Sequence, residues 1–180
     1  MVNKVSSKIG LLYRMRKQLA PPVIRDIYQT CILPTIEYGN LAWSGMGKSS
    51  SQLLDRVHRR AARLISGTRL ADHVSNNLLL SRAGLTSLVA HRKFRLAQFA
   101  FRFLNGSVPT HLSDAMEHWQ QSVSSRSLLL CKPPAIRLPR AKKILSISPL
   151  YLALSLWNSL PSEFRSAPLS VLKLHFLESS

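Results

Sequence analysis

Apolar residues recur every three or four positions along most of this chain, which is the spacing of one face of an α-helix. The first run of this kind predicts a helix over about residues 3–19, which ends where Ala20 is followed by two prolines. Lysines and arginines occupy its other face. The apolar face consists of Val5, Ile9, Leu11, Leu12, Met15 and Leu19.

A second helix is predicted to begin at Pro22, because the fixed φ of proline suits the first helical position. It continues through Ile32. Pro34 should then kink or split it, since the proline ring removes an amide donor and clashes with the preceding turn. The apolar and aromatic stretch 35–43 continues the pattern up to a turn at Ser44–Gly47.

A third helix is predicted over about residues 51–66. Ser49, Ser50 and Ser51 offer N-caps, and Gly67 is suited to a C-terminal stop. Its predicted buried stripe consists of Leu53, Leu54, Val57, Ala61, Leu64 and Ile65.

The rest of the chain is also predicted to be helical, except for one irregular segment. Further helices are expected at about 74–83, 86–104, 111–119, 148–157 and 170–177. Asn105–Gly106 marks a turn, and residues 120–147 lack periodicity, so a basic loop is expected there, with room for a short hairpin across 128–145. The pattern predicts an all-α protein whose parts are residues 1–67, 68–119, 120–147 and 148–180.

Composition is that of a folded protein without a membrane span. The 180 residues are 46% hydrophobic, and this length fits one domain or two small ones with a real core. No uncharged apolar run approaches the roughly 20 residues of a membrane span. Cys31 and Cys131 lack the spacing of a zinc site and predict free thiols in a reducing, intracellular compartment, either nuclear or cytoplasmic.

The chain is strongly basic, with 25 Lys and Arg residues against 8 Asp and Glu, a formal net charge of +17. Such a chain repels itself unless a polyanion neutralises it, and nucleic acid is the commonest polyanion. We therefore expect RNA, DNA or an RNA–DNA hybrid as the partner. No Asp-Asp, Asp-x-Asp or Glu-x-Asp pairing exists to hold the Mg²⁺ of phosphoryl transfer, and no serine has the setting of a nucleophile. We expect no catalytic residue, metal, cofactor or small-molecule substrate.

Four arginines of the third predicted helix are spaced i, i+3, i+4 and i+7 and therefore share one face. They are Arg56, Arg59, Arg60 and Arg63. Like charges on neighbouring turns destabilise a helix, and a guanidinium can bind phosphate oxygens through two hydrogen bonds. We expect this face to contact a duplex backbone, chiefly through Arg60 and Arg63, with an ordinary solvated face as the alternative.

Basic residues gather in three other places, and each set is either a nucleic-acid contact or a solvated surface. These sets are Lys4, Lys8, Arg14 and Lys17 of the first helix, Arg92 and Lys93 of the helix at 86–104, and Arg137, Arg140, Lys142 and Lys143 of the irregular segment. Four aromatic residues beside apolar ones are predicted to pack in the core rather than to stack on bases. They are Tyr28, Tyr38, Trp43 and Trp157.

Several segments of the chain point to one family. They read KIGLLYRMRKQLAPPV at 8–23, YQTCILPTIEYGNLAW at 28–43, LDRVHRRAARLISG at 54–67, RKF at 92–94 with FLNGSVP at 103–109, and LWNSLP at 156–161. Together, and in this order, they resemble the thumb region of non-LTR (LINE-type) retrotransposon reverse transcriptases, especially animal elements of the jockey type and their relatives.

This resemblance implies a three-helix thumb-like bundle at 1–67, whose helices lie along the template–primer hybrid. A smaller helical subdomain with the irregular basic loop would follow and help to hold template RNA or target DNA. The resemblance also favours a nucleic-acid role for the basic residues of the first helix, since a thumb helix there would enter the minor groove of the hybrid.

The chain departs from the family at the catalytic centre. An aromatic-x-Asp-Asp strand with a third upstream Asp is absent, and so are the fingers and the endonuclease. We therefore expect a truncated copy, separated from its palm and fingers, that grips template–primer or RNA through phosphates and is no enzyme on its own. Two alternatives stay open: a transposon remnant without function, and a basic helical protein that binds anionic membranes or acidic protein partners.

Overall fold

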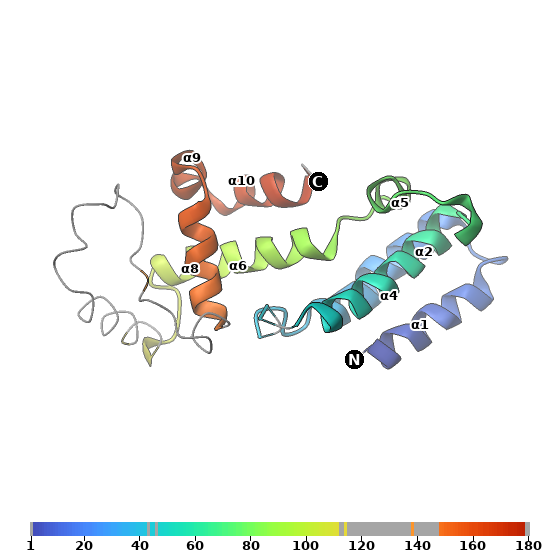
Figure 1. Ribbon diagram of the computed structural model, residues 1–180, viewed down its shortest axis with the longest axis horizontal. Coiled ribbons are helices and arrows are strands. Elements are labelled where there is room, and N and C mark those ends of the chain that lie inside the picture. Colours follow the sequence, from blue (N-terminus) through green and yellow to red (C-terminus); the bar gives the residue numbers. More distant parts are fainter. Residues whose placement is uncertain are drawn as a thin grey trace. The chain divides into compact units, whose positions relative to one another are not determined.

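The computed structural model describes a protein of the all-α class (Figure 1), as the sequence predicts. The described residues are 2–42, 44–45, 47–111, 114, 138 and 148–178. Within these ranges no β-strand occurs, and no helix is both long enough and apolar enough to cross a bilayer. The chain divides into two compact units, which fall within residues 1–40 and 46–91 for unit 1, and within residues 41–45 and 92–179 for unit 2.

Unit 1 is built around α4 (Lys48–Ser66), which contacts α1 (Val2–Met15), α2 (Pro21–Ile27) and α5 (Asn76–Ala83). In Figure 1, α2 and α4 run side by side and α1 lies next to them. Each large apolar side chain buried here contributes about 1.5–3 kcal/mol. The fully buried core residues include Val5, Ile9, Tyr28, Ala62 and Leu79.

Pro34 splits the second predicted helix, as expected. α2 passes into a π-helical turn, η1 (Tyr28–Ile32), and α3 (Leu33–Glu37) follows with Pro34 in its first turn. The Leu33 amide donates to the Tyr28 carbonyl, five residues back. This wider turn accommodates the missing amide and the proline ring, which would disturb a regular α-helix.

Several helix boundaries differ from the predicted ones. α1 ends at Met15 rather than near residue 19, α2 begins at Pro21, and α3 ends at Glu37, well before residue 43. α4 begins at Lys48, and Gly47 occupies the N-cap position that we assigned to a serine. Local residue type fixes helix ends weakly, because tertiary packing competes with it.

Glycines end two helices of unit 1. Gly67 follows α4 with φ 68°, a left-handed conformation that other residues rarely adopt, so the predicted stop is confirmed. A short 3₁₀ turn, η2 (Leu70–Asp72), comes next. Ser75 caps α5 by accepting from the Leu78 amide, and Gly84, with φ 62°, ends α5.

Unit 2 contains most of α6 (Leu88–Leu104) and then α8 (Pro149–Ser159), α9 (Ser162–Ser166), α10 (Leu169–Lys173) and the π-helical turn η5 (Leu174–Glu178). α8 crosses α6 (Figure 1), and the rings of Phe101 and Trp157 lie 6.2 Å apart between centroids. The sequence pattern did not predict α9. The helix expected at 111–119 and the loop expected at 120–147 lie almost entirely outside the described residues.

Burial differs from the prediction at individual positions. Tyr28 and Trp157 are buried, as expected, but the Tyr38 side chain is 80% exposed, so its assignment to the core is wrong. Leu53 is also exposed, whereas its neighbour Leu54 is buried in the core. Trp43 lies outside the described residues.

Candidate nucleic-acid interface

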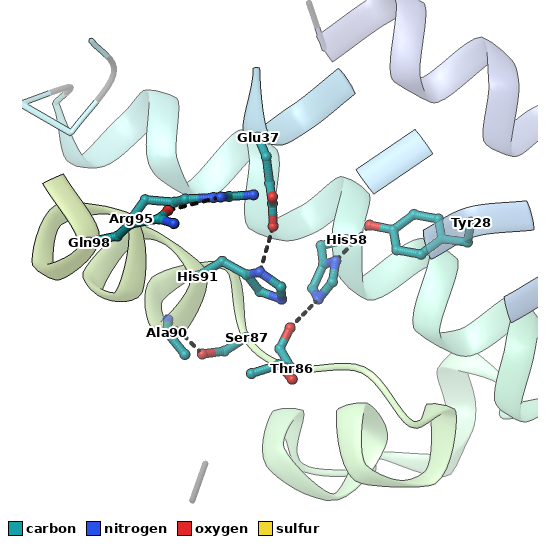
Figure 2. A network of polar contacts seen from close by, with 9 residues as sticks. All are labelled: Tyr28, Glu37, His58, Thr86, Ser87, Ala90, His91, Arg95 and Gln98. Atoms are coloured by element: carbon teal, nitrogen blue, oxygen red, sulfur yellow. Dashed lines mark hydrogen bonds and ion pairs between the residues drawn. The ribbon is translucent and has the colours of Figure 1, made fainter. Parts of the chain in front are cut away.

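A buried chain of hydrogen bonds joins three segments of unit 1 around His58 (Figure 2). The His58 Nε2 atom lies 3.0 Å from the Thr86 carbonyl oxygen, which can only accept, so Nε2 carries the proton. Nδ1 then accepts from the Tyr28 hydroxyl across 2.6 Å. Burial lowers the pKa of His58 to about 4, so the ring is neutral at pH 7. Burial, with a contribution from the Glu37 carboxylate, raises the pKa of the Tyr28 hydroxyl.

These bonds fix the rotation of α4 about its axis. Successive residues of an α-helix are turned by about 100°, so Arg60 and Arg63 lie on roughly the opposite side of α4 from the buried His58. Arg59, one position after His58, lies on the flank instead. A further contact, between Glu37 Oε1 and His91 Nδ1 at 2.5 Å, joins α3 to the first turn of α6 (Figure 2).

The four arginines of α4 therefore do not form one equivalent face. Arg59 Nε donates to the Asp55 carbonyl across 3.2 Å, and its Nη1 donates to Asn76 Oδ1 across 3.3 Å, which ties Arg59 to the start of α5. Arg60 makes a longer contact of 3.4 Å to the Ser6 hydroxyl of α1. Arg56 is exposed. Only Arg60 and Arg63 face the space between α4 and α1.

That space is a pocket of about 690 Å³, which we call the arginine pocket. Arg60 and Arg63 line it together with Arg16, which follows α1, and Arg69, which follows Gly67. No carboxylate lines it, and among the described residues none forms an ion pair with these four guanidiniums. Its apolar lining consists of Ile9, Tyr13, Leu64 and Leu70.

The basic residues predicted for the first helix also differ from one another, and one of them, Lys17, lies beyond the end of α1. Lys8 Nζ donates to the Cys31 carbonyl across 3.3 Å and to the Thr35 hydroxyl across 3.2 Å, so it ties α1 to η1 and α3. The side chains of the other three are exposed and make no hydrogen bond or ion pair with any described residue. They are Lys4, Arg14 and Lys17.

Reasoning from helical spacing did not select Arg16, Arg69 or Tyr13 for the site. Arg16 and Arg69 lie just outside helices, where spacing gives no information about direction. The Arg16 guanidinium lies over the Tyr13 ring, 3.8 Å from its centroid. The sequence carries one local signal for Arg69, which is Gly67. Its left-handed conformation turns the chain sharply at the end of α4, two residues before Arg69.

The other predicted contacts do not belong to the described part of unit 1. Arg92 and Lys93 belong to the part of α6 in unit 2, where Lys93 is exposed and Arg92 is partly buried. The remaining four predicted residues lie outside the described ones. They are Arg137, Arg140, Lys142 and Lys143.

The described His, Cys, Asp and Glu residues include no group of three that could hold a metal ion. The arginine pocket can bind anions through its guanidiniums and flat or apolar groups through its lining. In comparisons with known proteins, no family model, no curated protein and no solved structure matches this chain.

Proposed function

We propose that unit 1 binds a nucleic-acid duplex, in particular an RNA–DNA hybrid, through contacts to its phosphates. The observation that carries this proposal is the convergence of Arg16, Arg60, Arg63 and Arg69 on one pocket that no carboxylate lines. Guanidiniums gathered in this way repel one another, and phosphate oxygens both relieve that repulsion and accept paired hydrogen bonds. Residues 1–91 add a general attraction, with 13 Lys and Arg residues against four Asp and Glu.

In this proposal the chain is the thumb and connection of a LINE-type RNA-directed DNA polymerase, and the duplex is its template–primer. The family resemblance supports this, because the segment LDRVHRRAARLISG forms most of α4 with its glycine stop and carries Arg60 and Arg63 on the side away from His58. The palm and fingers would be its partners. The chain alone would hold the duplex without extending it, because the sequence lacks the catalytic aspartates.

The proposal is tested by titrating a fluorescently labelled, blunt RNA–DNA hybrid with the full chain and following anisotropy at several KCl concentrations. Because phosphate contacts release counterions, log affinity should fall linearly with log salt, by about 0.9 per phosphate engaged. Replacing Arg60→Glu together with Arg63→Glu should weaken binding by roughly tenfold or more and lower the slope by about 2.

The matched control is Arg82→Glu together with Arg102→Glu. Both residues are exposed and neither lines the arginine pocket, yet the change in net charge is the same. This control should lose much less affinity. An equal loss in the two double variants would mean that only net charge matters, and failure of the unaltered chain to bind the hybrid at low salt would refute the proposal.

An anionic membrane is the second candidate partner, and the surface of α1 favours it. Leu11 is 56% exposed and Tyr13 is 51% exposed, and the exposed Arg14 lies on the same helix. Apolar and basic side chains on one helix can lie in a lipid headgroup layer. Sedimentation with phosphatidylserine vesicles, with and without competing hybrid, separates the candidates. If the chain leaves the vesicles only at hybrid concentrations far above those that saturate it in the anisotropy titration, the membrane is favoured.

A further inference from the structure

We infer that the arginine pocket holds one unpaired nucleotide of the bound nucleic acid, with its base against Tyr13 and Leu70 and its phosphates on Arg60 and Arg63. This inference rests on the proposed function and adds a site for a base to the phosphate contacts. Duplex phosphates can be met by a flat basic surface. The pocket, at about 690 Å³, instead has the size of a small-molecule site, roughly 300–1,000 Å³.

The lining has the chemistry that receives an unpaired base. Tyr13 is 51% exposed and Leu70 is 76% exposed, so both offer apolar surface to a ligand in the pocket. The Arg16 guanidinium lies 3.8 Å from the centroid of the Tyr13 ring and forms a stacked pair with it. Bases stack on aromatic rings and on guanidinium planes alike, and this stacking tolerates any sequence because every base has a π face.

The arginines exceed what the surrounding helices need. α1 and α4 both end at this pocket, and the C-terminal end of a helix carries about −0.5 of a charge, which attracts a basic side chain. Two such ends and the Asp72 carboxylate, which accepts from the Arg69 amide across 2.6 Å, amount to roughly two negative charges, whereas four guanidiniums carry four positive ones. The excess positive charge is available to the phosphates on either side of one nucleotide.

The test compares the affinity of the full chain for a blunt hybrid, for the same hybrid with one unpaired nucleotide at an end, and for that hybrid with an abasic unpaired residue. The unpaired nucleotide should raise affinity by roughly fivefold to a hundredfold, the range of stacking one base, and the abasic residue should not. Tyr13→Ala should remove this gain, so that the overhanging and blunt hybrids bind this variant with equal affinity, whereas Tyr13→Phe should keep the gain.

Tyr38→Ala is the matched control, because Tyr38 is 80% exposed and does not line the pocket, and it should keep the gain. Leu70→Ala, at a largely exposed position, gives a second variant that spares the core and should reduce the gain. Circular dichroism confirms that each variant is folded.

Equal affinity for the blunt and overhanging hybrids would overturn the inference while the proposed function stands. A gain that the abasic residue matches, or that Tyr13→Ala and Tyr38→Ala reduce equally, would overturn it as well. Absence of binding to any hybrid would overturn both the inference and the proposed function. The outcomes above overturn the inference alone, so the two failures can be told apart.

Discussion

The Tyr28 hydroxyl donates to His58 Nδ1 across 2.6 Å in the core of unit 1, and this bond connects η1 to the centre of α4. The opposite nitrogen of the same ring donates to the Thr86 carbonyl, so His58 is held from two sides. A neutral imidazole held in this way can face the core in only one orientation. The side of α4 that carries Arg60 and Arg63 is thereby directed away from the core.

Tyr28→Phe should destabilise unit 1 by about 1–3 kcal/mol, because the substitution leaves the buried Nδ1 atom without its donor while the ring remains. Urea unfolding followed by far-ultraviolet circular dichroism measures the change. Tyr38→Phe removes the same hydroxyl from an exposed ring and should change stability by less than about 0.5 kcal/mol. Equal effects of the two substitutions would contradict a structural role for the Tyr28 bond.

Acidification should weaken the fold between pH 6.5 and pH 4. In the unfolded chain His58 takes up a proton near its ordinary pKa of 6.5, whereas burial lowers its pKa in the folded chain to about 4. The unfolded state therefore binds more protons in this window, and the contribution of neutral His58 is complete above pH 6.5 and is lost as the pH falls, up to about 3 kcal/mol.

Urea unfolding at a series of pH values, compared between the unaltered chain and His58→Gln, isolates this contribution. The variant should be less stable at pH 7 and should depend less on pH across the window. Proton NMR of the His58 ring gives its folded pKa directly, and a value close to 6.5 would rule the prediction out.

Two glycines should respond oppositely to replacement by alanine. Gly84→Ala should destabilise by about 1–2 kcal/mol, because its φ of 62° is left-handed and a new Cβ would lie 3.2 Å from Arg25 Nη1. Gly10→Ala should stabilise by about 0.5–1 kcal/mol, because Gly10 lies within α1 and its Cβ would meet nothing within 4 Å. Thermal unfolding of the two variants side by side is the measurement, and a shift in the same direction for both would be incompatible with these local conformations.

Single substitutions in α4 should separate the binding arginine from the structural one. Arg63→Ala should lower the salt slope of hybrid binding by about 1, because Arg63 lines the arginine pocket. Arg59→Ala should leave that slope unchanged and reduce stability instead, since Arg59 is bonded to Asp55 and Asn76. The anisotropy titrations and urea unfolding described above report both quantities, and equal slopes for the two variants would show that the whole arginine face makes contact.

The sequence predicts most of the secondary structure, because helices and their stops are encoded locally. The apolar spacing identifies α1, α4 and α6, and Gly67 and Gly84 mark helix ends through a conformation that other residues avoid. Pro34 likewise predicts an interruption of the second helix, since the clash and the missing amide come from the proline itself. The form of that interruption, the π-helical turn η1, was not predicted.

Burial is less predictable at helix flanks and in turns. Tyr38 is an aromatic residue beside apolar ones, which is typical of a core position, but it follows the end of α3 and is largely exposed. His58 shows the opposite case: a polar residue beside arginines is buried because Tyr28 and Thr86, far away in the sequence, satisfy both of its nitrogens.

What the sequence by itself determined is the all-α class, the positions of the main helices and an excess of positive charge. Only the tertiary structure decided which basic residues are bonded within the fold and which line the arginine pocket. In the folded chain Arg59 and Lys8 are hydrogen-bonded to neighbouring helices. Arg16 and Arg69 line the arginine pocket together with Arg60 and Arg63. The reason is physical: helical spacing fixes the direction of a side chain relative to its own helix, whereas a pocket forms where packing brings together residues that are distant in the sequence.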